Sequence, residues 1–115
     1  MADDCLFCKI AAGEIPSTQV YSDDDFYAFL DIQPAAPKHI LVIPRRHVAH
    51  ISDLTAADAD LAGRLILTAN KVAAQEGMQE TGFRVVINCG EGAGQLVFHL
   101  HLHLLGGRVM GWPPG

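Results

Sequence analysis

Histidines and apolar residues alternate strictly between positions 98 and 104 of the chain. The histidines are His99, His101 and His103, which we call the histidine array; leucines separate them and Phe98 precedes them. A period of two is typical of a half-buried strand, on which residues i, i+2 and i+4 share one face. We therefore expect the three imidazoles to project from one face, roughly 7 Å apart, while Phe98 and the leucines face a core.

A second pattern predicts one long helix. Thr55 and Asp58 are spaced as an acidic capping box, and apolar residues follow at helical intervals up to about Glu76. Gly77 should end the helix, because glycine readily adopts the left-handed conformation of a helix terminus. The core-facing positions are Leu61, Leu65, Thr68, Ala69 and Val72. A shorter apolar-faced helix is expected within residues 5–15.

Shorter runs of β-branched and aromatic residues predict the other strands. These runs span residues 19–21, 26–31, 39–43 and 82–88, and the first two should form a hairpin. Strands outnumber helices and do not alternate with them, which favours an α+β fold in which an antiparallel sheet carries the long helix. Residues 1–115 have the size of a single domain, with residues 106–115 as an irregular C-terminal tail.

Composition and charge argue against several functions. The net charge is −5, from 13 acidic and 8 basic residues, and no basic stripe is present that would bind a nucleic acid backbone. No apolar run approaches the length of a membrane span, and the first residues lack the pattern of a signal peptide. We therefore expect a soluble, cytoplasmic protein that binds neither nucleic acid nor membrane.

The histidine array permits three interpretations. It could be a polar strand facing water, a three-histidine metal site with water as fourth ligand, or a catalytic site in which one imidazole attacks and a neighbour moves protons. The glycine-rich turn Gly90–Gly94 favours the third, because glycine lets backbone N–H groups approach an anion. His39 is either a buried core histidine or the group that orients the nucleophile. Asp31 is either a turn former or an acceptor for sugar hydroxyls.

Cys5 and Cys8 form a Cys-x-x-Cys pair that is ambiguous by itself. The pair could be two buried thiols or a redox pair, but a thioredoxin-like motif needs a preceding strand, for which residue 5 leaves no room. With two histidines the pair would make a tetrahedral structural zinc site. The candidate ligands are His47, or His50 in its place, and one histidine of the array.

Several segments together resemble the histidine-triad (HIT) family, and in particular its HINT branch of nucleotide-binding proteins. The defining motif of the family is His-φ-His-φ-His-φ-φ, where φ is apolar, and residues 99–105 match it. The resemblance extends over residues 7–16, 28–32, 39–44 and the tail 106–115. Because these segments are spread along the sequence, the resemblance covers essentially the whole chain.

This resemblance implies an α+β fold whose two subunits join their sheets into one continuous sheet. It also implies hydrolysis of the P–N bond in phosphoramidates of AMP or GMP, with aminoacyl-adenylates as related substrates. His101 would attack the α-phosphorus without a catalytic metal, His103 would contact the phosphate and move protons, and His39 would steady both. By the same resemblance the base would lie against Leu6, Phe7, Ile10, Phe29 and Ile32, the ribose against Asp31, and the phosphate against Asn88, Gly94 and Gln95.

Two departures from the HINT pattern matter. HINT proteins often have serine directly after the glutamine of the turn, whereas this chain has Leu96. A hydroxyl contact to phosphate would be lost, so a nucleotide-binding scaffold with little turnover is the alternative function. Cys5 and Cys8 instead resemble other HIT proteins, which hold a structural zinc with a histidine of a Pro-x-x-His segment and the first histidine of the array. Here these histidines would be His47 and His99.

Overall fold

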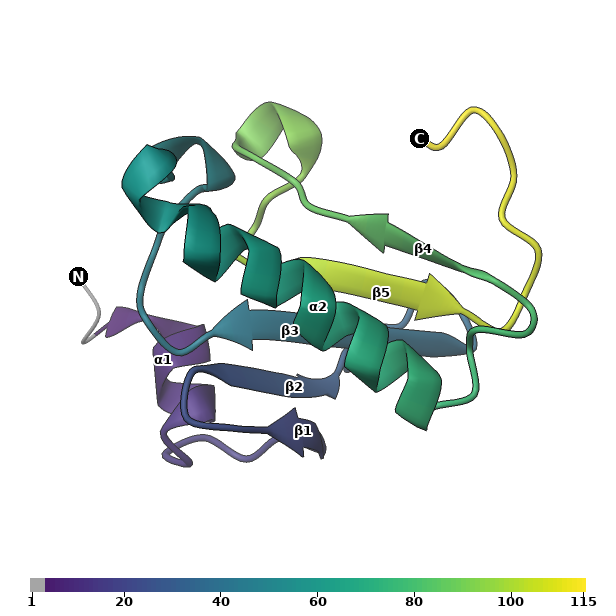
Figure 1. Cartoon of the computed structure of the whole chain (residues 1–115), viewed down its shortest axis with the longest axis horizontal. Helices are drawn as coiled ribbons and strands as arrows, with labels where there is room; N and C mark the ends of the chain where they lie inside the picture. Colours follow the sequence, from purple (N-terminus) through teal and green to yellow (C-terminus); the bar gives the residue numbers. More distant parts are fainter. Residues whose placement is uncertain (1–3) are drawn as a thin grey trace.

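An antiparallel sheet of five strands forms the centre of the fold (Figure 1). The structure, a computed structural model, describes residues 4–115. The strands are β1 (Gln19–Ser22), β2 (Phe26–Leu30), β3 (Lys38–Pro44), β4 (Phe83–Val86) and β5 (Leu102–Gly106). Their order across the sheet is β1-β2-β3-β5-β4, and neighbouring strands are antiparallel. The expected α+β fold and the first hairpin are confirmed.

The helix α2 (Ala59–Gln75) covers one face of this sheet. It follows a short 3-10 turn at which Thr55 and Asp58 form the predicted capping box. The buried residues of α2 include Leu65, Thr68, Ala69 and Val72, as the helical spacing predicted. Leu65, Ala69 and Val72 pack against apolar residues of the sheet, namely Phe26, Ala28, Ile40, Val42, Leu102 and Leu104. Neither α2 nor any other helix within residues 4–115 is long and apolar enough to cross a bilayer.

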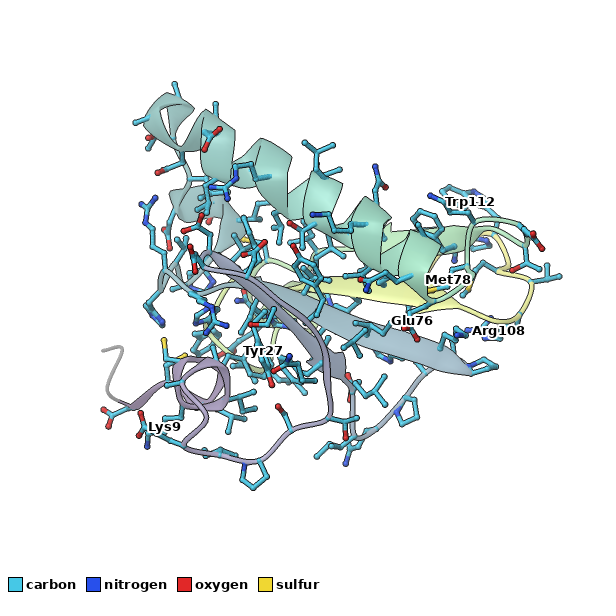
Figure 2. All side chains as sticks on the ribbon, turned by 60° about the horizontal axis from the view of Figure 1, so that its bottom comes forward. Lys9, Tyr27, Glu76, Met78, Arg108 and Trp112 are labelled. Carbon is cyan, nitrogen blue, oxygen red and sulfur yellow. The ribbon has the colours of Figure 1, made fainter. Side chains whose placement is uncertain are left out.

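The opposite face of the sheet carries the short helix α1 (Leu6–Ala11), which confirms the expected N-terminal helix. Phe7 and Ile10 of α1 pack into a second apolar cluster with Tyr27, Phe29, Leu41 and Ile43, and Figure 2 shows Tyr27 on the α1 side of the sheet. Leu41 pairs with His103 across β3 and β5. Since side chains alternate along a strand, His39 and His103 face the α1 side with Leu41.

The strand that carries the array is shorter than its alternation predicted. β5 begins at Leu102, so residues 98–101 lie outside the sheet, and Phe98 is 49% exposed instead of facing the core. The reason is that β3 ends at Pro44, where the chain turns away and proline offers no N–H to a neighbouring strand. The N–H of Leu100 donates instead to the carbonyl of Val48 at 2.6 Å. The leucines of the alternation are buried, as predicted.

The ends of β4 and β5 also differ from the expectation. β4 covers residues 83–86 of the expected 82–88, and β5 includes Gly106, which the sequence assigns to the irregular tail. A Cβ atom at Gly106 would lie 2.6 Å from Cε of Met78, so the end of the methionine side chain would have to move. Figure 2 shows Met78 close to the end of α2. Residues 107–115 are irregular, as expected.

Candidate active site and metal centre

A pocket of about 450 Å³ opens between α1, the end of β2 and the segment that precedes β5. Its wall is apolar on the α1 side, and two histidines of the array lie in it. Most residues that we expected against a nucleotide line this pocket: Leu6, Phe7, Ile10, Phe29, Asp31, Ile32, Gly94, His101 and His103. Asn88 and Gln95 are not among its lining residues. An apolar pocket with a few convergent polar groups suits a base attached to a phosphate.

One hydrogen bond determines which ring nitrogen of His101 is free. Nδ1 of His101 lies 2.7 Å from the carbonyl oxygen of His99, and because a carbonyl can only accept, Nδ1 carries the proton. Nε2 of the neutral imidazole then keeps its lone pair. Burial lowers the pKa of His101, which keeps the ring neutral near pH 7. His101 therefore offers a nucleophilic nitrogen at the pocket.

A chain of hydrogen bonds gives His103 the opposite tautomer. The backbone N–H of Ala35 donates to Nδ1 of His39 at 2.9 Å, so the proton of a neutral His39 lies on Nε2. This Nε2 is 2.9 Å from Nδ1 of His103 and 3.4 Å from a carboxylate oxygen of Asp31. Nδ1 of His103 is therefore an acceptor, and its Nε2 carries the proton. The pocket receives one lone pair and one N–H donor from its two histidines.

The pKa values of these histidines agree with neutral rings. Burial lowers the pKa of His103 to about 4, and the neighbouring rings of His101 and His39 act in the same direction while Asp31 opposes them. Burial also lowers the pKa of His39, against the attraction of Asp31. At neutral pH both rings are thus uncharged, as the hydrogen bonds require.

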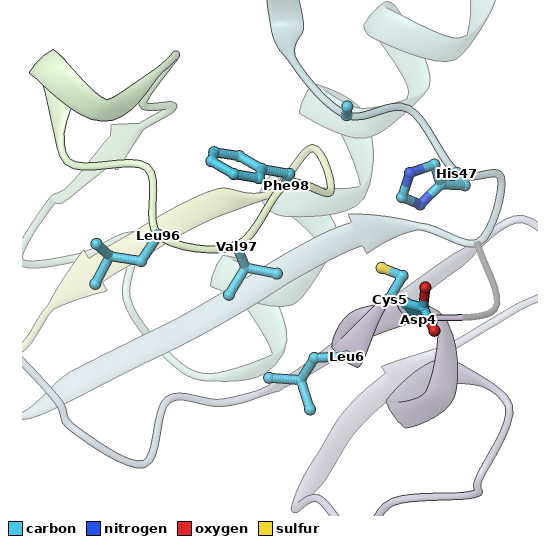
Figure 3. A pocket seen from close by; sticks show the side chains of 8 residues that line it. Asp4, Cys5, Leu6, His47, Leu96, Val97 and Phe98 are labelled. Atoms are coloured by element: carbon cyan, nitrogen blue, oxygen red, sulfur yellow. The ribbon is translucent and has the colours of Figure 1, made fainter. Parts of the chain in front are cut away.

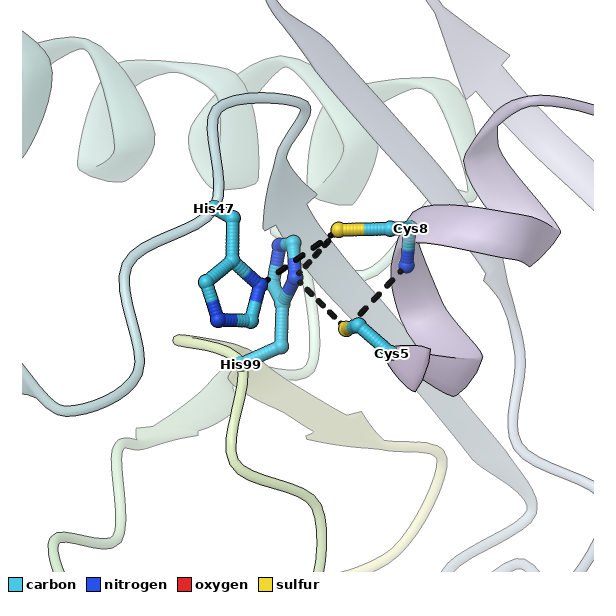
Figure 4. Close-up of side chains that lie close together, drawn as sticks. All are labelled: Cys5, Cys8, His47 and His99. Atoms are coloured by element: carbon cyan, nitrogen blue, oxygen red, sulfur yellow. Dashed lines mark hydrogen bonds between the residues drawn. The ribbon is translucent and has the colours of Figure 1, made fainter. Parts of the chain in front are cut away.

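Cys5, Cys8, His47 and His99 form a separate cluster beside α1, which we call the metal group (Figure 4). Nδ1 of His99 lies 3.2 Å from Sγ of Cys5 and 3.5 Å from Sγ of Cys8. Nδ1 of His47 lies 3.4 Å from Sγ of Cys8. A tetrahedral zinc with Zn–S of about 2.3 Å and Zn–N of about 2.0 Å has S···N edges of about 3.5 Å. The metal group therefore has the dimensions of a structural zinc site.

One hydrogen bond leaves a nitrogen of the metal group free to bind a cation. Nε2 of His99 donates to the carbonyl of Pro44 at 2.8 Å, which leaves Nδ1 with the lone pair that a metal needs. Burial and the neighbouring Cys5 raise the pKa of the Cys8 thiol to about 11. Such a thiol loses its proton readily only beside a positive charge. Two sulfurs and two imidazole nitrogens could therefore hold a metal ion.

His50, the alternative ligand, lies elsewhere and contacts Gln95. Nδ1 of His50 is 2.8 Å from Oε1 of Gln95, which also accepts the N–H of Gly90 at 2.8 Å. Nε2 of Gln95 donates to the carbonyls of Ala49 at 2.8 Å and Val97 at 3.1 Å. Gln95 is 2% exposed. Its buried amide joins the segments around Ala49, Gly90 and Val97. Nothing in the sequence marked this role, because three of the four partners are backbone groups.

A second trio, Asp31, His39 and His103, is also compact enough to hold a metal ion by distance alone. The N–H of Ala35 argues against it, because this bond places the proton of His39 on Nε2, the nitrogen that would have to bind the metal. The trio therefore fits proton sharing better than metal binding. Within residues 4–115 the array divides, with His99 in the metal group and the other two histidines at the pocket.

A second cavity of about 460 Å³ adjoins the pocket (Figure 3). Leu6, Leu96 and Val97 line both spaces, and Leu96 is 90% exposed. Leu96, where HINT proteins often have serine, thus presents an apolar surface at the pocket. The other lining residues of this cavity are Asp4, Cys5, His47, Ala49 and Phe98.

Comparison with known proteins identifies relatives along the whole chain. The model of the HIT domain family matches residues 12–110. An uncharacterized HIT-like protein of Synechococcus elongatus is 52% identical over 115 residues, which is 100% of both proteins. The purine nucleoside phosphoramidase of Escherichia coli K12 is 47% identical over 111 residues, covering 96% of this chain and 93% of that protein.

Solved structures show the same fold. A HIT family hydrolase of Legionella pneumophila matches with a TM-score of 0.95 and 53% identity, over 97% of this chain and 100% of that chain. A histidine triad nucleotide-binding protein of Candida albicans matches with a TM-score of 0.81 and 34% identity, over 96% of this chain and 83% of that chain. The array, the sheet that carries it and these matches confirm the resemblance: the chain belongs to the HIT domain family.

Proposed function

We propose that this chain is a purine nucleoside phosphoramidase, which hydrolyses the P–N bond of AMP and GMP amines through a nucleotidyl-histidine and takes aminoacyl-adenylates as related substrates. The observation that carries the proposal is the lone pair on Nε2 of His101, which the bond from Nδ1–H to the carbonyl of His99 provides at the pocket. The similarity to the Escherichia coli phosphoramidase, at 47% identity, supports the same reaction.

The reaction has two displacements at phosphorus. Nε2 of His101 attacks the α-phosphorus of a phosphoramidate whose nitrogen is protonated, the P–N bond breaks, and a neutral amine leaves. Water then attacks the phosphorus, the bond to Nε2 breaks, and the nucleoside monophosphate and a neutral imidazole are released after loss of a proton to water. Dividing one step into two in this way is nucleophilic catalysis, and no metal is needed at the reacting atoms.

The positions of the ring protons suggest how the residues around His101 take part in the reaction. Positive charge develops on the ring of His101 during the attack, and it strengthens the bond from Nδ1–H to the carbonyl of His99. Nε2–H of His103 donates to a phosphate oxygen, where negative charge builds up. His39 fixes this donor by occupying Nδ1 of His103. Asp31 lies at the pocket, where it accepts ribose hydroxyls, and it also faces His39.

We also propose that zinc is the ion of the metal group and that its role is structural. Cys5, Cys8, His47 and His99 would hold it, and the bound zinc would join α1 to the array. Thiolate and imidazole are the ligands of structural zinc sites. Such ligands suit a reducing compartment, which agrees with a cytoplasmic location.

A homodimer with one continuous sheet is the proposed assembly. β4 is an edge strand of the sheet, and an edge strand offers free N–H and C=O groups to another chain. Val85 of β4 is 42% exposed, and Ile66 and Leu67 of α2 are 54% and 64% exposed. A second copy that pairs along β4 would extend the sheet and cover apolar surface.

Turnover of adenosine 5′-phosphoramidate tests the proposed reaction. The zinc-loaded wild type should release AMP, and His101→Gly should release none until imidazole is added to replace the missing ring. Alkaline quench during turnover should trap a nucleotide on the wild-type protein. A folded, zinc-loaded wild type that releases no AMP would refute the proposal.

Leu96 favours a second candidate function, a nucleotide-binding scaffold with little turnover. The exposed leucine supplies no hydroxyl beside the phosphate position. In that case calorimetry would detect AMP binding, while adenosine 5′-phosphoramidate would remain intact over many hours. The two measurements on one preparation separate the scaffold from the enzyme.

A further inference from the structure

We propose that Phe7 couples the metal group to the nucleophile: zinc fixes helix α1, and α1 holds Phe7 against the ring of His101. This inference rests on the proposed function, which makes His101 the nucleophile and zinc the ion of the metal group. Phe7 is then a positioning residue, and the metal affects turnover although it lies outside the reacting atoms.

The first step of the coupling is the dependence of α1 on its cysteines. α1 contains six residues, and isolated helices of this length are unstable in water. Its N-cap is Cys5, whose Sγ accepts the N–H of Cys8 at 3.3 Å. The first turn of the helix is therefore also the Cys-x-x-Cys loop, as Figure 4 shows. A metal bound to both sulfurs fixes the turn from which Phe7 projects.

The second step is the contact between Phe7 and the nucleophile. Phe7 lies between the two cysteines in sequence and is 5% exposed. Its ring centroid is 5.1 Å from that of His101 with an interplanar angle of 89°, and 6.1 Å from that of His99 with an angle of 66°. Both are edge-to-face arrangements, which aromatic rings prefer. Phe7 thus contacts the nucleophile and a metal ligand at the same time.

The other restraint on His101 also begins in the metal group. Nδ1 of His101 donates to the carbonyl of His99, and the ring of His99 is held by Pro44 on one nitrogen and by the metal group on the other. Loss of zinc therefore weakens both supports of the nucleophile. It also releases the α1 wall of the pocket, to which Leu6, Phe7 and Ile10 belong.

Phe7→Leu separates this coupling from loss of the metal itself, because it leaves all four ligands in place. The variant should keep the zinc content of the wild type and lose about three- to tenfold in kcat, the size expected for one edge-to-face contact. In protein labelled with ¹⁵N-histidine, the ring signals of His101 should shift or broaden in zinc-loaded Phe7→Leu. The same signals should change in wild type treated with chelator, while those of His39 stay unchanged.

Phe29→Leu is the matched control. Phe29 lines the same pocket and packs edge-to-face on Phe7 at 5.4 Å, but the aromatic partners of His101 are Phe7 and His103. Its substitution should raise KM through the lost pocket wall, and it should shift the ring signals of His101 less than Phe7→Leu does. A variant that only loosens the pocket would therefore not reproduce the effect of Phe7→Leu.

Unchanged kcat together with unchanged His101 signals in zinc-loaded Phe7→Leu would overturn the coupling. If Phe7→Leu does not fold, Phe7→Met, which keeps an apolar side chain but no ring, replaces it. The value of kcat and the ring signals of His101 are then measured in that variant. The ring signals need no turnover. A wild type that releases no AMP would thus refute the proposed function, while the signals would still decide whether the metal group and His101 are coupled.

Discussion

Gln95→Glu tests whether the amide of Gln95 holds the segments around the array together. The substitution keeps the shape of the side chain and replaces the NH₂ group by an oxygen. The carbonyls of Ala49 and Val97 lose their donor, while the N–H of Gly90 and the ring of His50 keep an acceptor. Because the site is 2% exposed, water cannot replace the lost bonds.

The size of the effect follows from the two unpaired carbonyls and the buried carboxyl. Each buried polar group left without a partner costs about 1–3 kcal/mol. A protonated glutamic acid satisfies one carbonyl, but a proton must then be taken up at neutral pH. We expect a loss of about 3 kcal/mol in the free energy of unfolding near pH 7, which is roughly 12 °C in Tm for a domain of this size.

The pH dependence of this loss has a definite sign. The buried carboxyl has a pKa above its unfolded value of about 4.3, so the folded variant binds more protons than the unfolded chain as the pH rises from there. The loss should therefore be larger at pH 8 than at pH 5. Thermal unfolding of zinc-loaded wild type and variant measures it, with Gln79→Glu, at an exposed position, as the control for added charge. A loss below about 1 kcal/mol at pH 8, with a raised KM, would refute this role and favour the phosphate contact that the resemblance implied.

The remaining predictions concern the metal, the pH dependence, the pocket and the assembly. Elemental analysis of protein purified without chelator should find about one zinc per chain. Cys5→Ser should lose this zinc, whereas Cys89→Ser, which removes an exposed thiol, should keep it. A metal-free wild type would contradict the proposed zinc site. The pKa of His103 is about 4 in the folded protein and about 6.5 in the unfolded chain, so the unfolded state binds more protons in between. The free energy of unfolding should therefore rise with pH across this range. The value of kcat/KM should not change with pH above about 6.5. A titration of kcat/KM with its midpoint above a pH of about 7 would contradict a neutral His103 ring. Leu96→Ser should raise kcat/KM by up to about tenfold through a hydroxyl contact to phosphate, and an unchanged rate would show that the leucine does not limit turnover. Light scattering should find a dimer, which Val85→Lys shifts toward monomer, and a monomeric wild type would rule out the joined sheet.

Elements with a local cause could be predicted from the sequence. The capping box at Thr55 and the buried face of α2 depend on residues a few positions apart, and the structure has both. Residue chemistry also identified Cys5 and Cys8 as candidate zinc ligands together with two histidines, but the choice of His47 and His99 came from the resemblance to the HIT family. The capping box and the buried helix face needed only residue types and spacing.

Features that depend on particular backbone N–H and C=O groups could not be predicted. The alternation alone extends the strand to Phe98, but the end of β3 at Pro44 removes the neighbour with which that strand would pair. The N–H of Ala35, which sets the tautomer of His39, leaves no trace in residue type either. Such groups become partners only when the fold brings them together.

The shortened strand explains how three equal residues acquire unequal chemistry. In a sheet, backbone carbonyls are taken by neighbouring strands, and array side chains on one face would have similar surroundings. Because residues 99–101 lie outside β5, the carbonyl of His99 is free to accept from the ring of His101. The ring of His103, which lies inside β5, bonds His39 instead of a carbonyl, and this bond decides which of its nitrogens carries the proton. The departure from the alternation thus separates the nucleophilic lone pair from the N–H donor two residues later.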